Sequence, residues 1–126
     1  VTVSGANDMK TARVLAKSVV SNNLVKVALF GEDANWGRVL AAMGGSGADF
    51  DPERVDISFE SGKNGVTLMQ KGVPLSFDEN TASKILGHDK VNINIDLNSG
   101  SQEASAYGCD LGYKYIKMNS EYRFRR

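Results

Sequence analysis

A chain of 126 residues fits one domain and is long enough to bury a substantial hydrophobic core. Fifteen Lys and Arg residues balance fifteen Asp and Glu residues, and this zero net charge argues against a nucleic-acid binder, which normally carries a basic excess. The sequence contains no apolar run near the ~20 residues of a membrane span and no signal-peptide pattern, so we expect no membrane partner.

The first half of the chain contains segments whose apolar residues are spaced as in a strand and others in which they are spaced as in a helix. Residues 1–4 alternate as a strand does, and the chain begins at Val1 within this alternation, which is typical of a processed or cut product. Apolar residues at three- and four-residue spacing predict a helix over 8–21, capped by Asn7 or Asp8. The Val- and Leu-rich run at 24–30 is short and predicts a strand. A helix is expected over 36–43, capped by Asp33 or Asn35 and ended by the glycines at 44–47.

The second half is expected to contain most of a sheet. Strands are predicted at 55–60 and 66–70, joined by a hairpin turn at 61–65 in which Asn64-Gly65 is the strongest signal. A second turn at 71–72, an extension at 73–77 and a helix at 79–86 between Asp78 and Gly87 follow. Residues 91–97 and 103–109 are expected to be partner strands, and residues 110–118 a short helix or an irregular segment ending at Asn119. The fold class is α+β, a mixed or antiparallel sheet with helices packed mainly on one face.

Few residues of this chain have the chemistry of an active site. The single histidine, His88, lies in a predicted surface turn, and Cys109 is expected to be a buried or semi-buried thiol. One Cys and one His form no zinc-ligand set, and we expect no metal and no cofactor. The adjacent carboxylates Glu32 and Asp33 are interpreted as capping or solvated groups. Trp36 is expected in the core or against a neighbouring domain. No self-sufficient active site is predicted.

Three segments, in this order, carry a family resemblance. They are residues 30–42 (FGEDANWGRVLAA), residues 47–57 (GADFDPERVDI), and residues 108–111 (GCDL) with 115–123 (YIKMNSEYR). Together they resemble the C-terminal part of the ornithine acetyltransferase family of arginine biosynthesis, the bifunctional glutamate N-acetyltransferases. The resemblance covers essentially all 126 residues, which would form one domain at the C-terminal end of the β-fragment.

The resemblance implies a reaction that requires residues outside this chain. Enzymes of this family cut themselves at an Ala-Thr bond, and the new N-terminal threonine transfers acetyl from N-acetylornithine to glutamate; some members also use acetyl-CoA. The implied partners are the α-fragment and the N-terminal part of the β-fragment, in a hetero-oligomer of two α and two β fragments. The implied location is cytoplasmic, or mitochondrial in a eukaryote. The nucleophile would lie before Val1, so no catalytic residue is expected here.

Asn119 is the residue of this chain that the resemblance marks as a substrate contact. Its amide can donate to a carboxylate and accept from an amine, whereas the alternative interpretation is a capped C-terminal turn. Five residues later the family usually has threonine or serine, but this chain has Phe124, which supplies no hydroxyl. We do not assign that second role to Phe124.

A hypothesis from another class remains open on residue chemistry alone. The absence of a nucleophile would also suit a non-catalytic amino-acid-binding or assembly domain. Binding calorimetry with ornithine, glutamate and their acetyl forms separates the two hypotheses, because tight binding by the isolated chain is expected only of a binding domain.

Overall fold

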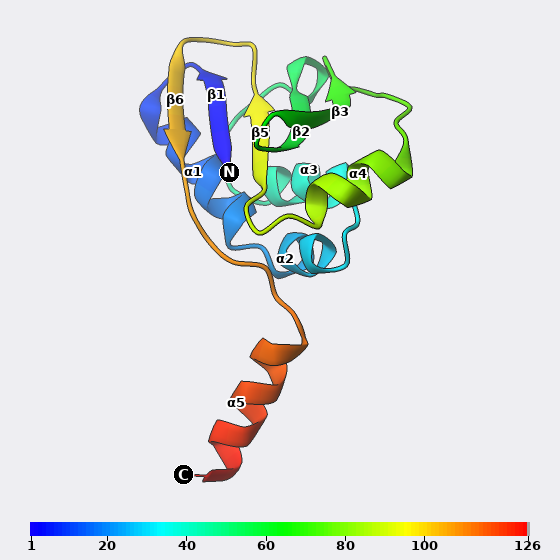
Figure 1. Ribbon diagram of the computed structural model, residues 1–126. Helices are drawn as coiled ribbons and strands as arrows, with labels where there is room; N and C mark the ends of the chain where they lie inside the picture. The colour runs from blue at the N-terminus through cyan, green and yellow to red at the C-terminus, as the bar shows by residue number, and fades with distance from the viewer. Residues whose placement is uncertain (126) are drawn as a thin grey trace.

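The computed structural model describes the backbone of residues 1–125 and the side chains of residues 1–121. Its strands form one six-stranded sheet in the order β4-β3-β2-β5-β1-β6, and helices pack on it (Figure 1). The strands are β1 (Thr2–Ala6), β2 (Asp56–Ser61), β3 (Asn64–Gln70), β4 (Val73–Pro74), β5 (Asn92–Asp96) and β6 (Gln102–Ser105). The helices are α1 (Met9–Val20), α2 (Asn23–Phe30), α3 (Trp36–Gly44), the 3-10 helix η1 (Pro52–Arg54), α4 (Glu79–Leu86) and α5 (Tyr113–Arg125).

The sheet is mixed because β1 runs parallel to β5, whereas the other neighbouring strands are antiparallel. Ile95 of β5 pairs with Val3 of β1 on one side and with Ile57 of β2 on the other. All three side chains are buried, as strand alternation requires of residues that share one sheet face. This apolar row across the middle of the sheet is the part of the sheet that contributes to the hydrophobic core.

Helices α1, α3 and α4 supply the other half of this core. Helix α1 buries Ala12, Leu15, Ala16 and Val19, the apolar stripe that its sequence spacing predicts. The opposite sheet face is polar, and there Thr2 bonds to Ser105 at 3.0 Å between their hydroxyl oxygens. The α+β fold class is therefore confirmed, with a mixed sheet and helices on one face. No helix within the described residues is long and apolar enough to cross a membrane.

The predicted helix caps are confirmed at atomic detail. The Asp8 carboxylate accepts the Thr11 backbone N–H at 2.7 Å, and Asp78 accepts the N–H of Asn80 at 2.9 Å. Of the two candidates before α3, Asn35 is the cap, because its Oδ1 accepts the Arg38 N–H at 3.0 Å. Short polar side chains before an amphipathic run thus locate these helix starts.

The prediction of a strand at 24–30 is wrong, since these residues form helix α2. Asn22 caps this helix by accepting the Val25 N–H at 3.1 Å. Val25 and Ala28 are buried at a three-residue spacing that suits a helix and not a strand. An eight-residue helix is marginal alone, so packing against the core, rather than the composition of the run, decides its conformation.

Three smaller predictions about the sheet are also corrected. The first hairpin turns at Gly62 and Lys63, whereas Asn64 and Gly65 already pair with β2. Strand β6 ends at Ser105 and pairs with β1, because both sides of β5 are occupied by β1 and β2. The extension at 73–77 shortens to the two residues of β4, where Pro74 has no N–H for a longer ladder.

Candidate functional site

Residues 30–42 form the junction between α2, α3 and α4. The amide of Asn35 donates to Asp33 Oδ2 at 3.1 Å, and the Arg38 guanidinium donates to the Leu24 carbonyl oxygen at 3.0 Å. Glu32 Oε2 accepts the Ser83 hydroxyl of α4 at 2.9 Å. Trp36 is half-buried and packs against the core. These polar groups are engaged in joining helices, which supports the interpretation that they maintain the shape of the chain.

His88 and Cys109 line one cavity of about 880 Å³ at the end of the sheet where β5 begins. His88 is exposed in its turn, as predicted. Cys109 is also exposed, so the prediction of a buried or semi-buried thiol is wrong. Because β6 ends at Ser105, Cys109 lies on the connection beyond the sheet rather than on a strand facing the core. Among the described residues, no group of three or more His, Cys, Asp or Glu side chains could hold a metal ion.

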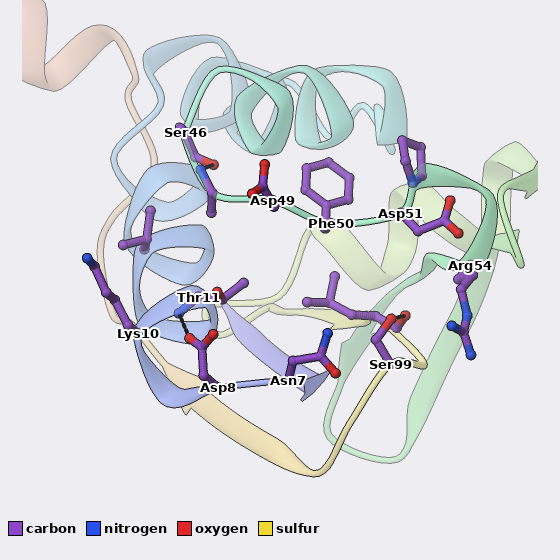
Figure 2. Close-up of a pocket in the computed structure, with 15 residues that line it drawn as sticks. Asn7, Asp8, Lys10, Thr11, Ser46, Asp49, Phe50, Asp51, Arg54 and Ser99 are labelled. Atoms are coloured by element: carbon purple, nitrogen blue, oxygen red, sulfur yellow. Dashed lines mark hydrogen bonds between the residues drawn. The ribbon is translucent and has the colours of Figure 1, made fainter.

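A second cavity of about 1060 Å³ opens at the carboxyl ends of β1 and β5, where ligands often bind in α/β sheets (Figure 2). Lys10 and Arg54 lie on its rim together with Asp49 and Asp51, so both signs of charge are present. The hydrogen bond from the Thr11 backbone N–H holds the pKa of Asp8 below its usual value.

Two hydroxyl groups of this second cavity, those of Ser46 and Ser99, are not arranged as nucleophiles. Ser46 donates to the Met43 carbonyl oxygen at 2.6 Å, and Ser99 donates to the Leu97 carbonyl oxygen at 2.9 Å. Each hydroxyl proton is therefore directed at a backbone oxygen and not at a general base. The cavity is a polar surface groove lined by hydroxyl and charged side chains.

Asn119 lies in neither cavity, because it is carried on α5, which stands away from the rest of the chain (Figure 1). The side chain is exposed. Helix α5 continues to Arg125, six residues past Asn119, so the alternative interpretation of Asn119 as part of a C-terminal turn is wrong. The side chain of Phe124 and the arginine-rich tail at 123–126 lie outside the residues whose side chains the structure describes.

Two contacts fix the root of α5 to α2. The Leu111 N–H donates to the Lys26 carbonyl oxygen at 3.3 Å. The rings of Phe30 and Tyr113 meet edge to face, with centroids 5.6 Å apart and planes at 84°. An edge-to-face pair at this distance is attractive and directional, so it orients the first turn of α5. These two contacts therefore set the direction of α5, the helix that carries the exposed amide of Asn119.

Comparison with known proteins agrees with the family resemblance. A model of the ArgJ family matches residues 1–124. A Thermotoga neapolitana protein named arginine biosynthesis bifunctional protein ArgJ is 50% identical over 98% of this chain and 31% of its own length. The Clostridium acetobutylicum protein named arginine biosynthesis bifunctional protein ArgJ 1 is 51% identical over 96% of this chain and 30% of its own length. This chain thus spans under a third of these curated relatives.

Two further matches bear on the fold and on the range of organisms. The crystal structure of arginine biosynthesis bifunctional protein argJ from Bacillus halodurans has a TM-score of 0.88 and 37% sequence identity, over 96% of this chain and 55% of that one. A Zea mays protein with the same name, described as chloroplastic, is 49% identical over 97% of this chain and 26% of its own length.

Proposed function

Because the chain belongs to the ArgJ family, we propose that it is the C-terminal domain of the β-fragment of a glutamate N-acetyltransferase. The whole enzyme transfers acetyl from N-acetylornithine to glutamate, and acetyl-CoA is a second donor to be tested. The observation that carries this proposal is identity near 50% along almost the whole chain to proteins named as bifunctional enzymes of arginine biosynthesis.

The nucleophile in this proposal is an N-terminal threonine that lies outside the chain. Its own α-amine can accept the hydroxyl proton, so the hydroxyl oxygen attacks the acetyl carbonyl. The amide C–N bond then breaks, ornithine leaves with that proton on its amine, and the acetyl group is held as an ester on the threonine. In the second step the amine of glutamate attacks the ester carbonyl, the ester C–O bond breaks, and the threonine hydroxyl is restored with the proton that the amine gives up. The hydroxyls of Ser46 and Ser99 donate to backbone carbonyl oxygens, so neither is assigned the role of nucleophile in this proposal. Alone, this chain is inactive in acetyl transfer.

Asn119 is the substrate-binding residue of the proposal. An amide offers two N–H donors and one carbonyl acceptor, so it can bond to the α-carboxylate of an amino acid and accept from its amine. Its exposure on α5 leaves these groups available to a ligand held elsewhere in the enzyme. A hydrogen bond to a charged group contributes about 1.5–3 kcal/mol, or roughly 10- to 100-fold in rate if it forms in the transition state.

The test is Asn119→Ala in the complete, autoprocessed enzyme. We expect kcat/KM for N-acetylornithine and glutamate to fall by roughly 10- to 100-fold, since the amide bonds to a charged group are lost. Ser120→Ala on the same helix is the matched control and should retain normal rates. Gel analysis of the two fragments shows whether self-cleavage is intact. An unchanged kcat/KM in Asn119→Ala would remove this residue from the site.

The proposed assembly contains two α and two β fragments and is located in the cytoplasm, or in the mitochondrion in a eukaryote. Equal numbers of the two fragments follow from the proposed self-cleavage, because each precursor yields one fragment of each kind; the number two is what the family resemblance implies. Native mass spectrometry of the complete enzyme measures the stoichiometry directly, and a single uncut polypeptide would contradict it.

A further inference from the structure

Helix α2 ends in a turn that commonly contains glycine at one position. The Asp33 N–H donates to the Ala28 carbonyl oxygen at 2.9 Å, and the Glu32 N–H donates to the Leu29 carbonyl oxygen at 3.1 Å. These two bonds define a Schellman motif, in which the residue after the helix cap takes left-handed backbone angles. That residue is Glu32, with a φ of 55°, whereas Gly31 before it has a φ of −80°. The glycine of this turn therefore lies one residue before the position that favours glycine.

The side chain of Glu32 has a partner on α4. Its Oε2 accepts the Ser83 hydroxyl at 2.9 Å. A Cβ on Gly87, the residue that follows α4, would lie 3.1 Å from Oε1, so this glycine leaves space for the carboxylate. The C-terminal end of a helix carries a negative partial charge, which disfavours a carboxylate nearby. Neither the backbone angle nor the helix dipole favours glutamate here, so we attribute its presence to the contact with α4.

Phe30 connects this turn to α5. It is the last residue of α2, two positions before Glu32. Its ring meets the Tyr113 ring edge to face at 5.6 Å and packs over Gly112. If the end of α2 turned relative to α4, this ring would move and the first turn of α5 would lose its support. A continuous path of contacts therefore leads from Ser83 through Glu32 and Phe30 to α5.

We propose that Glu32 is a positioning residue of the acetyltransferase. Its bond to Ser83 fixes the end of α2 on α4, which keeps the Phe30 ring in the place that orients α5. The inference rests on the function proposed above, in which α5 carries the substrate-binding Asn119. The competing explanation is that the carboxylate itself binds a substrate amine from the cavity that it lines. That role requires a negative charge, whereas positioning requires only an oxygen that accepts the Ser83 hydroxyl.

Kinetics of the complete, autoprocessed enzyme separate these two roles. Glu32→Gln retains an acceptor oxygen, so kcat/KM should stay within about 2-fold of the parent value. Glu32→Gly loses the acceptor, and kcat/KM should fall by roughly 10-fold because α5 is misplaced. Glycine adopts left-handed angles without strain, so the melting temperature of this variant should not fall. Ser83→Ala should lower kcat/KM as Glu32→Gly does. Equal losses in Glu32→Gln and Glu32→Gly, or a normal kcat/KM in Glu32→Gly, would overturn the proposal.

Two further variants test the route of the effect. Lys71→Gly is the matched control, because Lys71 also has a left-handed φ, of 46°, but lies in the turn between β3 and β4, and its kcat/KM should be normal. Phe30→Ala removes the ring through which Glu32 is proposed to act. Adding Glu32→Gly to Phe30→Ala should therefore cause little further loss of kcat/KM. Full additivity of the two changes would show that Glu32 does not act through Phe30 and would contradict the proposal.

Hydrogen–deuterium exchange of the complete enzyme provides a readout that does not depend on the reaction. The Leu111 N–H, which bonds to the Lys26 carbonyl oxygen at the start of α5, should exchange about 2- to 10-fold faster in Glu32→Gly than in the parent or in Glu32→Gln. Equal exchange in Glu32→Gly and the parent means that positioning fails, whether or not the enzyme transfers acetyl. If exchange is faster but the parent enzyme transfers no acetyl, the proposed function fails and the positioning of α5 stands.

Discussion

Gly112→Ala should shift the position of α5 although it changes no residue of that helix. A Cβ at this position would lie 2.5 Å from both Cδ2 and Cε2 of Phe30 and 3.1 Å from its Cγ. Carbon atoms in ordinary contact are about 3.5–4.0 Å apart, so the ring or the chain at residue 112 must move by about 1 Å. The backbone angle of Gly112 is not in the left-handed region, so the ring contact is the source of the strain.

The size of the effect follows from the geometry of this joint. If the Phe30 ring turns away, its edge-to-face contact with Tyr113 is lost, which costs about 0.5–1.5 kcal/mol. If the chain moves instead, the displacement is carried along α5 to Asn119, about 10 Å farther along the helix axis. A displacement of about 1 Å in a group that positions substrate can lower the rate by up to about 100-fold. We therefore expect kcat/KM of the complete enzyme to fall while the core retains its stability.

Steady-state acetyl transfer in the complete enzyme measures this effect, with Gly44→Ala as the control. Gly44 lies in α3, and a Cβ there would meet no atom within 4 Å, so kcat/KM should be unchanged. Phe30→Ala removes the obstructing ring, so adding Gly112→Ala to that variant should cause little further loss. Equal kcat/KM in Gly112→Ala and the parent enzyme, or full additivity with Phe30→Ala, would refute this reasoning.

Two further predictions concern the helix caps of the 126-residue chain. Asn35→Ala should lower the free energy of unfolding by about 1 kcal/mol in urea titration, because the Arg38 N–H loses its acceptor, whereas Asn35→Ser should lose less. Asp8→Asn should reduce the loss of folding stability that the parent chain shows as the pH is lowered below about 4. The folded pKa of Asp8 is below its usual value, so its stabilisation is present above about pH 4 and is lost as pH falls through the folded pKa. If the melting temperatures of Asp8→Asn and the parent chain fall equally as the pH is lowered, this assignment is contradicted.

The features that the sequence predicts well are those that depend on neighbouring residues. A cap needs a side-chain oxygen two or three residues before a free N–H, and Asp8, Asn35 and Asp78 meet this condition within a single turn. The strand β5 is equally local, because Ile93 and Ile95 alternate with asparagines. Family resemblance supplied Asn119, which periodicity alone would not distinguish from other exposed polar residues.

The features that the sequence predicts poorly depend on distant parts of the chain. A short apolar run such as 24–30 is compatible with a strand or a buried helix, and packing of Val25 and Ala28 decides in favour of α2. The pairing of β6 with β1 joins residues about a hundred positions apart, so no local pattern reveals it. Cys109 is exposed for the same reason, because its environment depends on where β6 ends.

The joint at Phe30 connects the two segments that carry the strongest family resemblance. Phe30 opens the segment at 30–42 and ends α2, and its ring packs over Gly112 and against Tyr113, where α5 begins. Residues 30–42 therefore have a structural role. Arg38 of α3 bonds to α2, and α2 in turn orients α5 through Phe30. The polar side chains of residues 32–38 stabilise this support through their hydrogen bonds. In the proposed function the substrate-binding group is Asn119, near the other end of the chain.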